Sequence, residues 1–175
     1  PTPAAAAAPA AAGAPISVAL VITPELKAVV WSHASELMRP MYLLGDVNNL
    51  GMATSLTLEQ TLKAMGLDVH VVESADEAQK LSAISYVLTP TIQRFEEHNK
   101  GLTTFAPFEE TIVVQWKVVD AKGNTVLLDT ALATAIGKLG NNFVAAEHAK
   151  AIEKKMLADL QEKSTALLHP VLVNP

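Results

Sequence analysis

The sequence predicts an α+β fold: a mixed or antiparallel sheet of four to five strands, helices packed on one face, and a long C-terminal helix. Two strongly alternating segments, 110–120 and 125–137, are joined by a short turn that contains a glycine. A long amphipathic segment then closes the chain, and short apolar runs alternate with helical patterns in the first half. Strands and helices arranged in this order form layered α+β domains.

The first half of the chain predicts one strand and one clear helix. Residues 16–23 (ISVALVIT) are apolar and β-branched and stop at Pro24, which is typical of a buried strand. Residues 50–65 carry leucines near helical spacing, and Gly66 supplies the stop. The segment 23–51 between them keeps no clean period, so we expect it to be irregular.

The middle of the chain predicts a strand, a short helix and another strand. Residues 67–73 (LDVHVVE) alternate as a strand does. Residues 74–83 begin with Ser74, a good N-cap, and continue with acidic residues, which indicates a helix. Residues 84–95 (ISYVLTPTIQRF) form the next strand, in which Pro90 favours an edge, a bulge or a break.

The last part of the chain predicts a connection, a hairpin and a helix. Residues 96–110 look like a polar connection, and the alternating pair that follows is a strong hairpin signal. The closing helix can begin at Asn141 or Asn142 and is not expected to pass Pro170. Its apolar positions at three- and four-residue steps are Ala145, Ala149, Ile152, Met156 and Leu160.

The opening fifteen residues differ from the rest of the chain. PTPAAAAAPAAAGAP has no charge and no aromatic residue, and its four prolines interrupt any helix. We therefore divide the chain into a flexible Ala/Pro tether (1–15), a single α+β domain (16–170) and a tail (171–175). Such a spacer is expected after a cleaved signal peptide or a lipid-modified residue; a cloning remnant or a linker from an upstream domain is the alternative.

Composition excludes several classes of function. The net charge is −5 and the 13 lysines and arginines are scattered, so we expect no nucleic-acid partner. The chain has no cysteine, which removes disulfides and thiolate chemistry but leaves the compartment open. No apolar run approaches the roughly 20 residues of a membrane-spanning helix.

The search for chemistry finds no catalytic motif. The five histidines show no metal-ligand spacing, and GDVNNLG lacks the residues of a phosphate-binding loop. Ser32 beside His33 lacks a nucleophile elbow. We therefore expect no enzyme and no catalytic, metal or cofactor site. An enzyme would need distant groups such as Asp46, His70 and Glu96 to meet in the fold.

Aromatic residues outside the expected core are the candidate contacts. Trp31 lies in the irregular segment, where it packs over a sheet end or helps form a recognition surface. Phe105 and Phe108 lie in the expected connection and look exposed, although that connection can also fold back onto the core. With Tyr42, these residues make up the predicted interaction surface: Trp31, Tyr42, Phe105 and Phe108.

Five stretches in order carry a family resemblance: SVALVITPELKAVVW, TLEQTLKAMGLDVHVV, ISYVLTPTIQRF, VVQWKVVDAKGNTVL and the closing helix. They resemble small Gram-negative outer-membrane lipoproteins of the YajG-like type and, more distantly, LptE, CsgG and TolB-amino-terminal-like periplasmic folds. The resemblance covers residues 16–168. It implies a domain tethered by an acylated residue to the inner face of the outer membrane. The lipid-bearing cysteine is not in this sequence, and no functional residue carries over.

The expected function is thus that of a non-catalytic cell-envelope lipoprotein, located in the periplasm and anchored to the outer membrane. It would act in binding or assembly, with an envelope protein or a second copy as partner and the membrane reached through a lipid upstream of Pro1. The alternative is a periplasmic small-ligand-binding protein. Its pocket would lie between the sheet and the region around Trp31, Tyr42 and residues 45–51.

Overall fold

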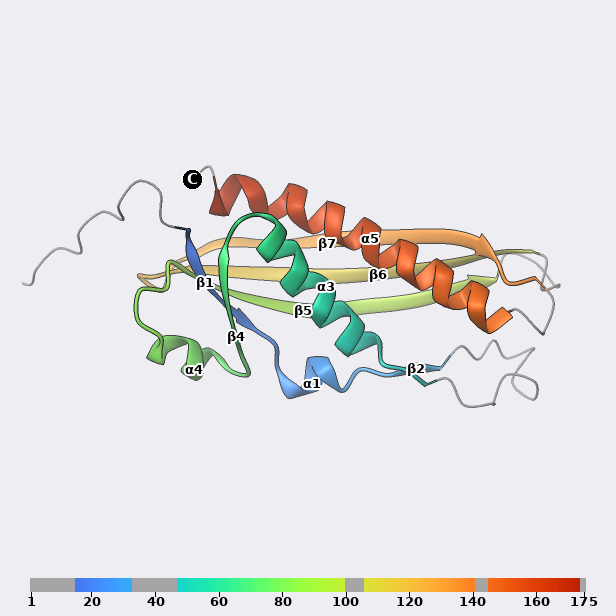
Figure 1. The fold of residues 1–175 in the computed structure, drawn as a ribbon, viewed down its shortest axis with the longest axis horizontal. Helices are drawn as coiled ribbons and strands as arrows, with labels where there is room; N and C mark the ends of the chain where they lie inside the picture. The colour runs from blue at the N-terminus through green and yellow to red at the C-terminus, as the bar shows by residue number, and fades with distance from the viewer. Residues whose placement is uncertain (1–14, 33–46, 100–105, 141–144, 174–175) are drawn as a thin grey trace, which may run out of the picture.

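A five-stranded mixed sheet forms the centre of the molecule (Figure 1). The structure is a computed structural model and describes residues 15–32, 47–99, 106–140 and 145–173. In chain order the elements are β1 (Ser17–Val21), α1 (Pro24–Lys27), β2 (Trp31–Ser32), β3 (Val47–Asn48), α3 (Leu50–Ala64), β4 (Asp68–Val72), α4 (Ala75–Lys80), β5 (Tyr86–Asn99), β6 (Pro107–Asp120), β7 (Thr125–Lys138) and α5 (Ala145–Leu172). The strand order is β4-β1-β5-β6-β7, and β2 pairs separately with β3. The predicted α+β class is confirmed.

Strand directions follow from the connections. β1 runs parallel to β4 and to β5, because helices cross between these strands. β5, β6 and β7 form an antiparallel meander of three 14-residue strands, joined in part by the predicted turn after Asp120. This long meander makes the sheet much longer at β5–β7 than at β1 and β4 (Figure 1).

α3 and α5 cover one face of the sheet, which we call the inner face (Figure 1). The predicted apolar stripe of α5 is confirmed, because Ile152, Met156 and Leu160 are buried in the core. On β6 the alternating residues Ile112, Val114, Trp116 and Val118 face the same core and are also buried. Hydrophobic burial on this face is the main stabilising contribution to the domain.

On the opposite face, which we call the outer face, the helix cover provided by the described residues lies near β1. There Ala78 of α4 packs against Ala19 and Val21 of β1 in a small second cluster. Ser74 caps α4 as predicted, because its hydroxyl accepts a hydrogen bond from the Glu77 amide at 3.2 Å. Since α4 is only six residues long, no helix of the described residues covers β7 on this side.

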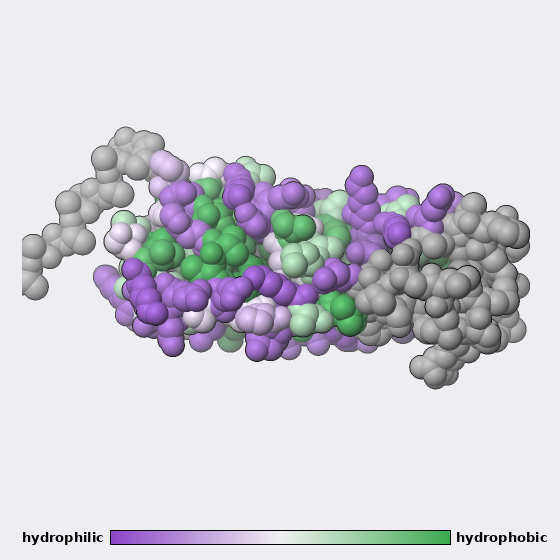
Figure 2. Space-filling view, turned by 60° about the horizontal axis from the view of Figure 1, so that its bottom comes forward, coloured by the Kyte–Doolittle hydropathy of each residue, from purple (hydrophilic) through white to green (hydrophobic). Residues whose placement is uncertain are grey.

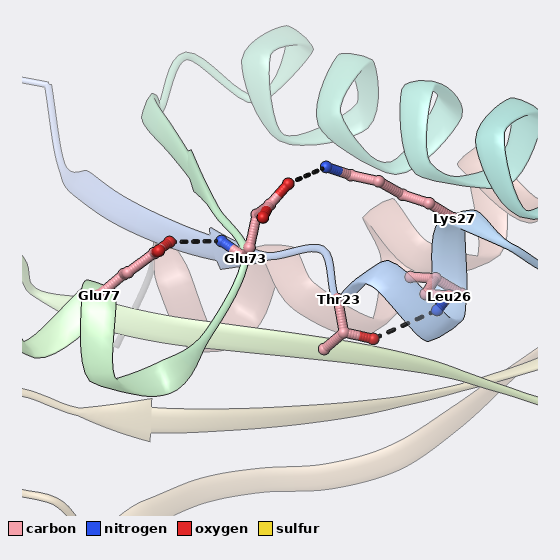
Figure 3. Close-up of polar contacts among 5 residues, drawn as sticks. All are labelled: Thr23, Leu26, Lys27, Glu73 and Glu77. Carbon is pink, nitrogen blue, oxygen red and sulfur yellow. Dashed lines mark hydrogen bonds and ion pairs between the residues drawn. The ribbon is translucent and has the colours of Figure 1, made fainter.

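Polar contacts fasten the short helices at the carboxyl ends of β1 and β4 (Figure 3). Thr23 caps α1 by accepting the Leu26 amide at 3.2 Å. Lys27 of α1 pairs with Glu73, which follows β4, at 2.8 Å, and the Glu73 amide donates to Glu77 of α4 at 2.8 Å. These groups bind one another, so the edge where parallel strands commonly hold a ligand is occupied by structural contacts.

The predicted polar connection at 96–110 is wrong for much of its length. β5 continues to Asn99 and β6 begins at Pro107, and His98 pairs with Glu109 across the two strands. Glu110 is fully buried on the inner face of β6. Polar residues occupy strand positions here because pairing with a long neighbour outweighs their weak intrinsic preference for strands.

The predicted irregularity of the strand around Pro90 is confirmed. β1 pairs only with Tyr86–Leu88 of β5, so Pro90 lies in the part of β5 that has β6 as its one paired strand. A β-bulge follows between Ile92 and Arg94. Proline is tolerated at such an edge because its missing N–H has no strand to bond there.

The predicted end of the last helix at Pro170 is wrong. α5 runs to Leu172, and the Val173 amide still donates to the His169 carbonyl at 3.0 Å. A proline inside a helix costs about 3 kcal/mol, because one hydrogen bond is lost and the ring meets the preceding turn. Burial of Leu168 and Leu172, both fully buried, offsets this by about 1.5–3 kcal/mol each.

Candidate interaction surface

A strand usually turns its large apolar residues toward the core. Strand β7 instead turns alanines toward the core and large aliphatic residues toward the outer face. Its inward positions hold Ala131, Ala133 and Ala135, which are buried under α5. Its outward positions include Leu128, Leu132 and Ile136, whose exposed fractions are 61%, 51% and 54%. The three large side chains recur every fourth residue, so they form a line along the outer face, which we call the β7 row.

The small inward residues let α5 approach the sheet closely. A Cβ added at Gly137 would lie 2.6 Å from Cγ1 of Ile152, so even an alanine crowds α5 at this point. The helix fills the space with its own large residues. The close approach of α5 requires small residues at the inward positions of β7. The larger residues therefore occupy the outward positions, without any shift of the strand register.

The register places partly covered and polar residues of β6 beside the β7 row. Val113 pairs with Leu132, Gln115 with Thr130, and Thr111 with Thr134, whose hydroxyl lies 3.1 Å from that of Thr111. Lys117 lies beside Leu128 at one end of the row. Glu109 lies beside Ile136 at the other end.

The free edge of β7 is protected by a side chain of α5. The Thr134 amide points away from β6, and Oδ2 of Asp159 accepts its hydrogen bond at 3.0 Å. An edge strand with unpaired amides invites pairing with another strand, and an inward-reaching carboxylate prevents it. Contact with partners is thus favoured on the outer face of β7 and disfavoured at this point of its edge.

We expect Asp159→Ala to lower the free energy of unfolding by about 1–3 kcal/mol, because the partly buried Thr134 amide loses its acceptor. Urea unfolding followed by circular dichroism measures the change. Glu162→Ala, an exposed site on the same helix, is the matched control and should change it by less than about 0.5 kcal/mol. Equal stabilities of the two variants would contradict this role for Asp159.

A shallow groove of about 490 Å³ lies on the outer face between α4 and the β6–β7 turn. Its floor includes Leu81, Val87 and Val119, and Lys117 and Lys122 line its other side. In the turn, Asp120 accepts hydrogen bonds from the Asn124 side chain and amide and from the Lys122 amide. These hydrogen bonds hold the pKa of Asp120 below its ordinary value, and those from Asn124 have the largest effect.

The structure describes only part of the predicted aromatic surface. Trp31 lies in the short strand β2, and Tyr42 and Phe105 fall outside the described residues. Phe108 is not exposed as a contact role requires: it lies on the inner face of β6 and is 4% exposed, so for this residue the alternative of folding back onto the core is correct. The alternation of β6 forces this, since Ile112 and Val114 share that face. A contact role for the other three residues stays a prediction.

One group of Ser, His and Asp side chains does meet on the surface. Nε2 of His70 lies 3.0 Å both from Oγ of Ser17 and from Oδ2 of Asp68, and Ser17 donates to Asp68 at 3.0 Å. A nucleophilic relay needs the serine and the carboxylate on different ring nitrogens. Here one nitrogen contacts both, so this cluster does not have the geometry of a relay.

The distant group considered for an enzyme is not assembled among the described contacts. Glu96 on β5 lies 3.5 Å from Nε of Arg94 and 3.4 Å from Nε2 of His98, whereas His70 lies on β4 beyond β1. Asp46 is outside the described residues. Within residues 15–32, 47–99, 106–140 and 145–173, no three His, Asp or Glu side chains gather as a metal site would require.

A second hydrophobic area is visible toward the opposite edge of the sheet from β7. Figure 2 shows hydrophobic side chains gathered over the end where β1 and β4 lie. Val71 on β4 is one exposed member, at 43%. Ile16, Val69 and Val171 are large apolar residues that are partly buried against the core. This area is therefore mostly the margin of the hydrophobic core, whereas the side chains of the β7 row are not part of that core.

Comparison with solved structures finds bacterial proteins to which this chain is similar. A minor lipoprotein from Acinetobacter baumannii matches at a TM-score of 0.51 with 14% identity, over 91% of this chain and 92% of that chain. A candidate lipoprotein from Caulobacter crescentus matches at 0.49 with 16% identity, over 71% and 84%. A protein from Xanthomonas campestris matches at 0.49 with 13% identity, over 91% and 84%. The match at a TM-score of 0.51 establishes a fold shared with the protein from Acinetobacter baumannii.

No protein-family model matches the sequence, and no curated protein matches it. Among the helices of the described residues, none combines the length and the apolar character that crossing a membrane requires. The chain thus has a fold that also occurs in a solved bacterial lipoprotein, and its candidate functional feature is the β7 row.

Proposed function

We propose that this chain is a non-catalytic envelope protein that acts in binding or assembly through the outer face of β6 and β7. The observation that carries the proposal is the β7 row: three large aliphatic side chains, each more than half exposed, on a strand whose alanines are buried. Large apolar side chains gathered on one exposed face in this way can mark an interaction site on a soluble protein. The flat sheet face suits another protein surface better than a small molecule.

The proposed location is the periplasmic side of the outer membrane, where the protein would be held by a lipid attached upstream of Pro1. Two observations support it: the Ala/Pro segment before β1 has the composition of a spacer, and the fold occurs in a minor lipoprotein. Within that class, the order of segments favours the YajG-like type. We propose no reaction for this protein, and its partner would be an envelope protein or a second copy.

The groove beside α4 supports a second candidate function, the binding of a small ligand. Its apolar floor and its two lysines would suit a small molecule with an aliphatic part and an acidic group. This site differs from the pocket predicted around Trp31 and Tyr42. The groove is shallow and open, so we rank this function below protein binding.

The location is tested with the full-length precursor expressed in a Gram-negative host. We expect mass spectrometry to find an acylated cysteine upstream of Pro1 and fractionation to place the product in the outer membrane. A soluble product with an unmodified amino terminus would contradict the proposed anchor. Cross-linking in intact cells, followed by mass spectrometry, should then place linked peptides from residues 107–138 against a partner or another copy.

A further inference from the structure

We infer that the outer face of β6 and β7 binds the same face of a second copy, in an antiparallel arrangement with a two-fold axis through Leu132. This deepens the proposed function, because it names the partner of the proposed surface and rests on that surface being the contact. The argument uses the spacing of the β7 row, the charges at its ends and its size.

The β7 row is symmetric about its middle residue. Leu128 and Ile136 each lie four residues from Leu132, about 14 Å away at about 3.4 Å per strand residue. A two-fold axis that crosses the strands at Leu132 therefore places Leu128 of one copy over Ile136 of the other. Leu132 then meets Leu132, so every large aliphatic side chain of the row gains an aliphatic neighbour.

Charge selects this axis over the other simple choice. Lys117 of β6 lies beside Leu128 and Glu109 of β6 lies beside Ile136, so the β6 residues next to the two ends of the row have opposite charges. The antiparallel arrangement brings each Lys117 toward Glu109 of the partner subunit. An axis parallel to the strands along β7 would place the β6 strands of the two copies on opposite sides of β7, so neither Lys117 nor Glu109 would gain an opposite charge.

The other charged groups on this face do not reverse that choice. Arg94 and Glu96 lie on β5 and pair with each other at 3.5 Å. Lys138, the last residue of β7, lies beyond Ile136 next to Pro107. A membrane-binding face would be expected to present cations around its apolar centre. This face presents both signs and places Thr130 and Thr134 between the aliphatic residues, which suits a protein surface.

The size of the face predicts a weak dimer. The row spans about 27 Å, and three strands across are about 14 Å wide, so the footprint is roughly 400 Å² per copy. Stable interfaces cover about 800 Å² per partner, and smaller ones are transient. We therefore expect dimers at about 100 µM that dissociate at about 1 µM. Tethering to one membrane would raise the local concentration and favour the dimer.

The oligomeric state of the purified chain tests the inference. We expect sedimentation velocity to show dimers at about 100 µM for the unmodified chain, and monomers at all concentrations for Leu132→Glu, which sets two carboxylates face to face on the axis. Leu56→Glu is the matched control. Leu56 is 52% exposed on α3, nearly the same as Leu132, but it lies on the other side of the sheet. This variant should dimerise like the unmodified chain.

Cross-linking tests the arrangement itself. The chain has no cysteine, so each single-cysteine variant reports one position. A bismaleimide of about 10 Å matches the spacing of packed sheets. We expect it to link Leu132→Cys to itself, and Leu128→Cys only when that variant is mixed with Ile136→Cys. Leu56→Cys should not be linked.

Three results from sedimentation and cross-linking would overturn the inference. They are a monomer at every concentration, self-linking of Leu128→Cys as strong as that of Leu132→Cys, or equal loss of dimer in Leu132→Glu and Leu56→Glu. Binding of the chain to anionic lipid vesicles that Leu132→Glu abolishes, without any dimer in solution, would also overturn it in favour of a membrane surface. None of these results depends on the acylated cysteine, so failure of the dimer and failure of the anchor are distinguishable.

Discussion

Trp116→Ala is expected to lower the free energy of unfolding by about 3–5 kcal/mol, a large part of the 5–15 kcal/mol typical of a whole domain. Trp116 is fully buried in the middle of β6 under α5. Its removal leaves a cavity between the sheet and the helix, and the loss includes both hydrophobic burial and packing contacts. Urea unfolding followed by circular dichroism measures the change.

The indole N–H of Trp116 makes a separate contribution that can be isolated. Nε1 donates to Oγ of Ser164, which is also fully buried, at 3.1 Å. Ser164→Ala leaves this donor without its partner and should cost about 1–3 kcal/mol. In Trp116→Phe the donor itself is gone, so adding Ser164→Ala to that variant should cost less than it does in the unmodified chain.

Gln115→Ala is the matched control for Trp116→Ala. It lies one residue away on the same strand but faces outward, so it should change stability by less than about 0.5 kcal/mol. An equal and large effect of both substitutions would mean that β6 tolerates no change at all. A small effect of Trp116→Ala would show that α5 closes over the space, which would contradict the tight packing against β7.

The strands and helices with a clear period were predictable, and the reasons are local. Alternation fixed the inward residues of β6, and the turn after Asp120 fixed the register of β7. Ser74 and Gly66 marked helix ends correctly, and Gly66 adopts the positive φ of 80° that such an end favours. Periodicity and capping act within a few residues, so they can be read directly from the sequence.

The misjudged features depend on contacts between segments that are distant in the sequence. Phe108 looked exposed because it was placed in a polar connection, but strand pairing with β5 turns it into the core. Pro170 looked like a stop, but burial of Leu172 carries α5 past it. In each case tertiary packing overrode a local preference.

The candidate surface was present in the sequence as an unusual alternation. In 131–136 alanine occupies every odd position, and larger residues occupy the even ones. The usual rule would turn the large residues inward, and only the register with β6 shows that the alanines go there. A strand whose small residues alternate with large aliphatic ones is thus a signal of a close helix on one side and of exposed apolar surface on the other.

Gly51→Ala is the second substitution with a large expected effect. Gly51 lies in the first turn of α3, where its amide donates to the Val29 carbonyl at 2.8 Å. A Cβ built there would lie 1.9 Å from the backbone oxygen of Leu26, at the end of α1. Backbone atoms cannot move aside as a side chain can, so α1 and α3 must separate.

The cost should reach about 3 kcal/mol or more, because overpacking costs about 1–3 kcal/mol and Leu26 also loses burial against Leu50. Helix propensity alone predicts the opposite sign, since alanine inside a helix is favoured over glycine by about 1 kcal/mol. Urea unfolding therefore separates the two effects by the direction of the change. Amide hydrogen exchange should show the loss of protection concentrated at α1.

Gly66→Ala is the control at the other end of α3. A Cβ there meets no atom within 4 Å, but φ is +80°, so the cost of about 1 kcal/mol is conformational. We expect Gly66→Ala to leave exchange at α1 unchanged, while Gly51→Ala exposes it. If Gly51→Ala stabilised the protein, the close approach of α1 to α3 would be wrong. The backbone contact that holds α1 beside the carboxyl end of β1 would then have to be replaced by a looser arrangement.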